Sequence, residues 1–231
     1  MTTTPLKPLT ETPRHAAGET KTESQMELNA EVNNAYLHVI TRLTSAADQR
    51  DHQTANHVKR VSAFSEILAK KAGLPDEQAR LIGLATPMYD VGKIGIADEI
   101  LLKPGKLSAE EFETMKKHVQ IGGDILAGSG SKLLELAREI ALTHHEKYDG
   151  TGYPKGLKGD EIPLAGRIVA ITDVFDALTS NRPYKTAWAI DQALNLLTAE
   201  KGQHFDPNLV ELFLQAMPEM IEVIQRYQDK F

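Results

Sequence analysis

The stretch PLAGRIVAITDVFDALTS, residues 163–180, decides the fold class that the sequence predicts. It is strongly apolar and has the length of a helix, although its Ile and Val content alone would also suit a strand. The segments before and after it space their apolar residues at helical intervals, and no alternating series typical of strands occurs. We therefore expect a buried helix here, within an all-α domain.

Helical spacing of apolar residues recurs from about Met26 onward. Gly73 and Pro75 punctuate one helix end, and Pro87 is expected to bend the last turn of another. Ser108 followed by Glu111 has the spacing of a capping box, which predicts a helix start. Asp206 and Pro207 form a cap and first-turn pair before the last helix. Besides 163–180, the expected helices cover residues 27–48, 54–75, 76–92, 108–119, 131–145 and 207–217.

The composition is that of one globular domain with an extension. The chain has 231 residues, of which 41% are hydrophobic and 25% charged, so a sizeable core is available. Residues 1–25 are rich in Thr, Pro, Glu and Lys without apolar periodicity, which predicts a flexible tail. Residues 26–231 are expected to form the helical domain.

Several functional classes are disfavoured by the same numbers. A net charge of −6 argues against binding to duplex nucleic acid, which usually needs a basic face. The absence of cysteine excludes disulfides, zinc thiolates and cysteine nucleophiles. There is no apolar run of membrane-spanning length and no signal-peptide core, so we expect a cytoplasmic location without membrane insertion.

Polar residues on expected inner faces are the strongest functional signal. One inward histidine is more often a hydrogen-bonded core residue, and one inward aspartate a cap or ion-pair member. A group of them on converging helices instead suggests a metal cluster. Histidine and carboxylate ligands without thiols suit Fe or Mn better than structural zinc. The candidates are His57, Asp90, His118, His144, His145 and Asp173.

The remaining histidines do not join this pattern. His15 lies in the tail, and His38 and His52 have no companions on their segments. His204 precedes a helix start and is expected to be a turn or capping residue. We leave these four out of the site.

With these residues assembled, the sequence resembles the HD-GYP family of metal-dependent cyclic dinucleotide phosphodiesterases over about residues 30–225. The resemblance implies an HD-domain-type helical bundle with a C-terminal GYP-containing extension, and a cyclic di-GMP phosphodiesterase. It rests on DHQTANHVKRV (51–61), YDVGKIGIADEILLKPGKL (89–107), MKKHVQIGGDIL (115–126), HHEKYDGTGYPKGLKGDEIPLAGRIVAITDVFDAL (144–178) and NRPYK (181–185).

The resemblance also implies roles for single residues. The family's metal ligands fall on the six candidates above, and Asp90 matches its bridging carboxylate. Lys93 matches a lysine that faces substrate phosphate, and Asp90 and Lys93 are the implied catalytic pair. The implied substrate-binding residues are Lys93, Gly152, Tyr153, Pro154, Arg182 and Lys185. Glu146 and Asp176 are candidates to orient ligand imidazoles, with solvated positions as the alternative.

Two departures from the family pattern concern the metals. The namesake His-Asp pair is Tyr89-Asp90 here, and tyrosine, with a reference pKa of about 10, is a poor ligand while protonated. Gln53 stands where three-metal members carry a glutamate. We therefore expect two divalent ions, Fe or Mn, and hydrolysis of cyclic di-GMP to linear pGpG by a hydroxide that the two ions activate.

Other interpretations stay open at this point. The loss of histidine at position 89 is also consistent with a catalytically weak or inactive metal-containing cyclic di-GMP receptor. A mixed cyclic dinucleotide is a third option, because substrate choice depends on pocket shape. A protein partner in second-messenger signalling and a dimer are both compatible with the sequence.

Overall fold

The computed structural model describes residue 42 and residues 55–181 and 186–229, all within a unit that spans Ile40–Phe231. No strand occurs among these residues, so the prediction of an all-α fold is confirmed there. The predicted tail (1–25), the helix expected at 27–48 apart from residue 42, and the pair Arg182 and Lys185 lie outside the described residues. The α-helices are α2 (Ala55–Lys71), α3 (Asp76–Ala85), α4 (Asp98–Leu101), α5 (Ala109–Ile125), α6 (Lys132–Thr143), α7 (Leu164–Thr179), α8 (Ile190–Ala199), α9 (Pro207–Gln215) and α10 (Met217–Arg226), and the 3₁₀ helices are η1 (Thr86–Met88), η2 (Val91–Gly95) and η3 (Gly159–Glu161).

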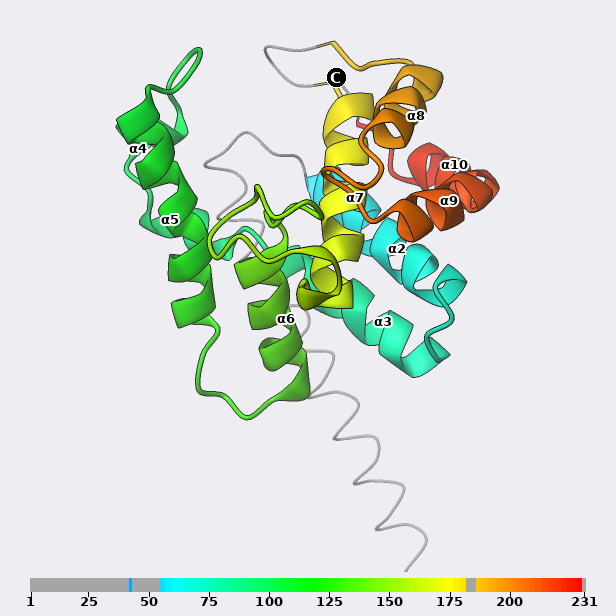
Figure 1. The fold of residues 1–231 in the computed structure, drawn as a ribbon, viewed down its shortest axis with the longest axis horizontal. Coiled ribbons are helices and arrows are strands. Elements are labelled where there is room, and N and C mark those ends of the chain that lie inside the picture. The colour runs from blue at the N-terminus through cyan, green and yellow to red at the C-terminus, as the bar shows by residue number, and fades with distance from the viewer. Residues whose placement is uncertain (1–41, 43–54, 182–185, 230–231) are drawn as a thin grey trace, which may run out of the picture. The chain divides into compact units, whose positions relative to one another are not determined.

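Helix α7 is the central element, as the apolar stretch 163–180 predicts. It contacts α2, α6, α8 and α9, and Figure 1 shows it in yellow between α6 on one side and α8 and α9 on the other. Ile168, Ile171 and Phe175 have no exposed surface. Burial on several sides explains why this helix lacks a polar face and reads like a buried strand in sequence.

Helix α2 packs its predicted inner face against α7. His57, Val61, Phe64 and Leu68, spaced at four, three and four residues, are all buried. The rings of Phe64 and Phe175 meet edge to face with centroids 5.7 Å apart. His57 therefore lies on the inner face of its helix, as expected.

Helix α3 ends earlier than its apolar spacing predicts. The sequence favours a helix through residue 92, but α3 stops at Ala85 and the 3₁₀ helix η1 follows, with Pro87 in its first turn. Proline has no N–H to donate to the carbonyl of Gly83 four residues earlier. The hydroxyl of Ser62 on α2 donates to that carbonyl instead. The chain then turns and brings Asp90 to the start of η2.

Helix α5 begins at the predicted capping box. The Ser108 hydroxyl accepts from the Glu111 N–H, and the Glu111 carboxylate accepts from the Ser108 N–H. Further along, α5 packs against η2 so closely that a Cβ on Gly92 would lie 1.9 Å from the carbonyl oxygen of His118. Glycine at position 92 therefore allows Asp90 and His118 to approach each other.

Among the helices of the described ranges, none combines the length and the apolarity that crossing a bilayer requires.

Candidate metal centre

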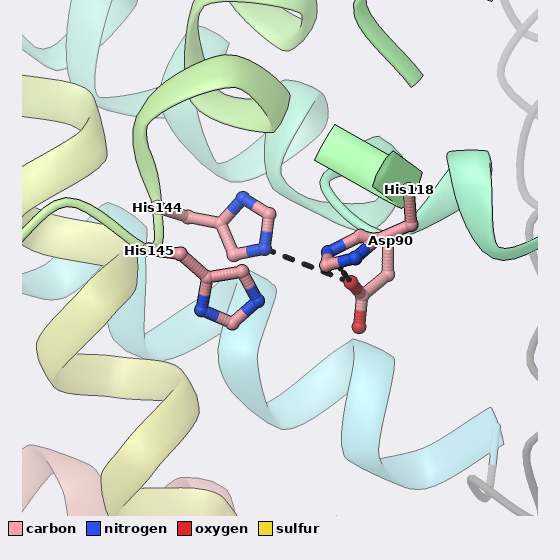
Figure 2. A group of neighbouring side chains, drawn as sticks. All are labelled: Asp90, His118, His144 and His145. Carbon is pink, nitrogen blue, oxygen red and sulfur yellow. Dashed lines mark ion pairs between the residues drawn. The ribbon is translucent and has the colours of Figure 1, made fainter. Parts of the chain in front are cut away.

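Four of the six predicted metal ligands meet at one point. One ligand atom from each of Asp90, His118, His144 and His145 lies within 4.8 Å of all the others. Asp90 comes from the junction before η2, His118 from α5, and the two adjacent histidines from the C-terminal end of α6. Figure 2 shows their side chains turned toward a common centre.

The orientation of two imidazoles follows from backbone carbonyls. Nδ1 of His118 lies 2.7 Å from the carbonyl oxygen of Met115, and Nδ1 of His144 lies 3.1 Å from that of Ala141. A carbonyl only accepts hydrogen bonds, so Nδ1 carries the proton in both rings. Nε2 of each neutral ring then presents a lone pair to the centre, which is the form that binds metals.

Asp90 divides its two carboxylate oxygens between different partners. Oδ1 lies 3.3 Å from Nε2 of His118 and 3.6 Å from Nε2 of His144, while Oδ2 lies 2.8 Å from Nζ of Lys93. Burial acts to raise the pKa of this carboxyl, but the Lys93 ammonium opposes burial, and the pKa lies well below its usual value. Asp90 is therefore ionised at neutral pH.

These atoms fit a divalent cation. Within the described part of the chain, Oδ1 of Asp90, Nε2 of His118 and Nε2 of His144 are buried and make no hydrogen bond. Two lone pairs and a carboxylate oxygen facing one another repel unless a positive charge lies between them. Mixed imidazole and carboxylate ligands are those of divalent transition metals, so this cluster is suited to holding such an ion.

His145 is positioned by the Gly-Tyr-Pro triplet. The Tyr153 ring stacks on the His145 ring with centroids 4.7 Å apart, and the Tyr153 N–H donates to the His145 carbonyl. A Cβ on Gly152 would lie 2.2 Å from the backbone nitrogen of Lys147, so only glycine fits there. Burial, followed by the neighbouring His144, lowers the pKa of His145 well below its usual value and keeps the ring neutral for ligation.

The loop after the histidine doublet is held from both sides. The buried Glu146 carboxylate accepts from the backbone N–H groups of Lys155 and Leu157, so it orders this loop rather than a ligand imidazole. The backbone carbonyls of Gln203 and His204 accept from the N–H groups at positions 149 and 148. His204 thus lies in a turn before α9, as predicted, and takes no part in the four-residue centre.

The other two predicted ligands, His57 and Asp173, form a neighbouring group around Tyr89. The Tyr89 hydroxyl donates to Oδ1 of Asp173 at 2.8 Å and lies 3.0 Å from Nε2 of His57. On its opposite side, His57 places Nδ1 2.7 Å from Oδ2 of Asp176. Asp176 thus orients a predicted ligand imidazole, which was one of the two alternatives for this carboxylate.

Sequence reasoning did not identify Arg60 or Phe112 as part of the site. The Arg60 guanidinium binds both oxygens of Asp176 and therefore fixes the carboxylate that holds His57. Phe112 is 43% exposed, and its ring lies edge to face with that of Tyr153. A signal for Arg60 was available, because it lies three residues after His57 on the same buried helical face.

The fold and the histidine-carboxylate centre are those of an HD domain. A family model described as an HD domain matches residues 42–209, and the chain belongs to this family.

The curated relatives to which the chain is similar carry the names of cyclic dinucleotide phosphodiesterases. The chain is 46% identical over 202 residues to a Vibrio cholerae protein named 3'3'-cGAMP-specific phosphodiesterase 2, covering 87% of this chain and 39% of the relative. It is 44% identical to a cyclic di-GMP phosphodiesterase response regulator of Xanthomonas campestris, covering 85% and 52% of the two chains. For a cyclic di-GMP phosphodiesterase of Thermotoga maritima the identity is 43%, with 88% and 55% covered. The chain thus spans about half the length of these relatives, or less.

Solved structures agree on the fold. A cyclic GMP-AMP specific phosphodiesterase of V. cholerae superposes with a TM-score of 0.61 at 20% identity, covering 84% of this chain and 53% of that chain. A protein of Bdellovibrio bacteriovorus gives a TM-score of 0.55 at 19% identity, covering 79% and 60%. At these identities the likeness concerns the helical fold.

Proposed function

We propose that this chain is a metal-dependent phosphodiesterase that hydrolyses cyclic di-GMP to linear pGpG. The observation that carries the proposal is the trio of buried atoms on Asp90, His118 and His144 that converge without hydrogen-bond partners in the described residues. Such a trio is expected at a metal centre and is costly elsewhere. The names of the curated relatives supply the substrate class, cyclic dinucleotides.

A bound divalent ion would activate water and neutralise charge on phosphoryl oxygens during in-line displacement. The chain's own contribution is to hold the ligands: the carbonyls of Met115 and Ala141 fix His118 and His144, and Tyr153 fixes His145. Water adds to phosphorus, the bond to the 3′ oxygen breaks, and the product keeps a 5′ phosphate.

The substrate contacts are part of the proposal. Lys93 is proposed to meet a phosphate oxygen beside Asp90, which its ammonium already contacts. Arg182 and Lys185 are proposed to bind the second phosphate, since the guanidinium fork suits oxyanions. Gly152, Tyr153 and Pro154 are proposed to border the substrate. The exposed ring of Phe112, with Nζ of Lys116 5.0 Å from its centroid, offers a stacking surface for a base.

The experiment combines elemental analysis of anaerobically purified protein with chromatography of the products formed from cyclic di-GMP. We expect divalent metal, Fe or Mn, and accumulation of pGpG. Parallel incubation with 3'3'-cGAMP tests the substrate of one relative. Metal-loaded protein that binds cyclic di-GMP but leaves it unchanged would contradict the proposed phosphodiesterase activity and indicate a cyclic di-GMP receptor instead.

Asp90→Ala is the variant that tests the centre. Loss of the carboxylate should abolish metal retention and lower turnover by at least ~1,000-fold, because several kcal/mol of transition-state stabilisation disappear. Asp124→Ala is the matched control, since Asp124 is exposed on α5 and its carboxylate bonds only Gln120 among the contacts described. An active, metal-loaded Asp90→Ala protein would overturn the proposal.

Four expectations from the sequence stay predictions. They are the two-ion stoichiometry, the cytoplasmic location, the dimer and the protein partner in second-messenger signalling. The contacts around Tyr89 bear on the first of these.

A further inference from the structure

Tyr89 completes a hydrogen-bonded group at the place where a second ion would need His57 and Asp173 as ligands. Its hydroxyl oxygen lies 3.0 Å from Nε2 of His57 and 2.8 Å from Oδ1 of Asp173, while these two atoms are 3.6 Å apart. The hydroxyl therefore lies in contact with both atoms that would coordinate the ion. A neutral phenol has one proton, which it donates to Asp173, and its oxygen contacts His57; it is itself a poor ligand for divalent ions.

The Tyr89 side chain is held in this position. It is 2% exposed and belongs to the hydrophobic core. Its ring meets the ring of His144 edge to face, with centroids 5.0 Å apart. A swing of the phenol away from His57 would open a cavity in the core and remove packing from a residue of the four-residue centre.

The carboxylate that would bridge two ions already has a cation on its second oxygen. Oδ1 of Asp90 faces His118 and His144, but Oδ2 lies 2.8 Å from the Lys93 ammonium. An ion bound between Oδ2, His57 and Asp173 would have to displace this ammonium as well as the phenol. The two halves of the predicted six-ligand site therefore differ. One has converging atoms without hydrogen-bond partners among the described residues, whereas in the other the Tyr89 hydroxyl contacts both atoms that would coordinate the ion.

From this contrast we infer that the chain binds one divalent ion, at Asp90, His118, His144 and His145, and that the Tyr89 hydroxyl and the Lys93 ammonium replace a second ion. The inference rests on the metal centre of the proposed function and revises the two-ion prediction made from the sequence. His57 and Asp173 become residues that position Tyr89 instead of ligands.

The test counts ions on the full chain without reference to activity. Protein stripped with a chelator is dialysed anaerobically against Mn²⁺, and bound manganese is measured per chain by elemental analysis. We expect one ion for the wild type and two for Tyr89→His, which supplies an imidazole between His57 and Asp173. Electron paramagnetic resonance gives a second readout, since an isolated Mn²⁺ and an exchange-coupled pair have different spectra.

Two further variants separate the hydroxyl from general effects of substitution. Tyr89→Phe removes the hydrogen bonds but adds no ligand, so it should still bind one ion. Tyr227→His changes a half-buried tyrosine at the end of α10, whose backbone carbonyl keeps its contact with Arg60, and should also bind one ion.

The outcomes decide between the possibilities. Two ions in the wild type overturn the inference, whether or not Tyr89→His folds. One ion in both the wild type and a folded Tyr89→His overturns the role of the hydroxyl. Wild-type protein with two ions that produces pGpG would refute this inference alone, while one ion without any turnover would refute the proposed function alone.

Discussion

The histidines of the site differ in the hydrogen-bond partner of Nδ1. In His118 and His144, Nδ1 donates to a backbone carbonyl, so the lone pair of Nε2 faces Asp90. In His57, Nδ1 contacts the Asp176 carboxylate, and Nε2 faces the Tyr89 hydroxyl. The same side chain therefore serves a metal centre in two cases and a hydrogen-bonded group in the third.

His204 shows how burial lowers the pKa of a histidine outside the centre. Burial, assisted by the Lys147 ammonium and opposed by Asp149, lowers the pKa of His204 to about 4. An unfolded chain has an imidazole pKa of ~6.5, so between these values only the unfolded state takes up the proton. The stability that neutral His204 contributes is complete above ~pH 6.5 and is lost as the pH falls toward 4.

His204→Gln should therefore weaken the pH dependence of stability. We expect the free energy of unfolding, measured by urea denaturation, to fall less between pH ~7 and ~4.5 in the variant than in the wild type. The other titratable groups are the same in both proteins, so their contributions to the pH dependence cancel when the two losses of stability are compared. Equal losses of unfolding free energy in the two proteins would contradict the lowered pKa of His204.

At the residue scale, the sequence predicts the candidates but not their partners. Spacing alone places His57 inward, and α2 confirms it. The Nδ1 contacts of His118 and His144 are with carbonyls on their own helices, but the meeting of Tyr89 with Asp173 joins residues 84 positions apart. Such long-range pairs carry no signal in one sequence.

At the scale of elements, the close contact between η2 and α5 sets the position of the centre. The sequence predicts α5 from its capping box and α7 from its apolar stretch, because these signals are local. It overestimates the length of α3: Pro87 lacks the N–H that would continue the helix, and the Gly83 carbonyl accepts instead from Ser62 of another helix, a contact that no local signal predicts. It also gives no hint that Gly92 is needed for packing between elements.

Gly92→Ala should disrupt this contact. The new Cβ would lie 1.9 Å from the His118 carbonyl oxygen and 2.4 Å from the Gly122 nitrogen, and backbone atoms cannot rotate away. We expect α5 to shift, at a cost of about 3 kcal/mol in unfolding free energy, with weaker Mn²⁺ binding because His118 moves. Thermal unfolding and metal titration measure the two effects.

Gly130→Asn provides the comparison for this variant. Gly130 has a φ of 63° and open space around its Cβ position, and asparagine tolerates that conformation. A change below ~0.5 kcal/mol is expected there. An equally mild effect of Gly92→Ala would show that the contact between η2 and α5 is not tight in solution.

At the scale of the whole molecule, the metal centre joins segments that are distant in sequence. Asp90, His118 and the doublet at 144–145 come from three separate places: the start of η2, helix α5 and the end of α6. The all-α class was predictable from periodicity, whereas the division of six candidates into a group of four and a group around Tyr89 was not. That division depends on how helices pack in three dimensions.

Metal should therefore stabilise the fold as a whole. An ion that binds only the native state at 100 times its dissociation constant adds ~2.7 kcal/mol, which corresponds to a rise in Tm of roughly 5–10 °C for a domain of this size. Differential scanning fluorimetry with Mn²⁺ or with a chelator measures this shift. Asp90→Ala should show no Mn²⁺-dependent rise, and an equal rise in the variant would place the binding elsewhere.

The guanidinium of Arg60 also joins the site to the segment after α10. Besides Asp176, it binds the carbonyl of Tyr227 and the carboxylate of Asp229. Asp176 in turn contacts Nδ1 of His57, and Asn56, next to His57, donates to the carbonyl of Gln228. An affinity tag or fusion that displaces residues 227–229 is therefore expected to perturb His57, so a purification handle should leave these residues in place.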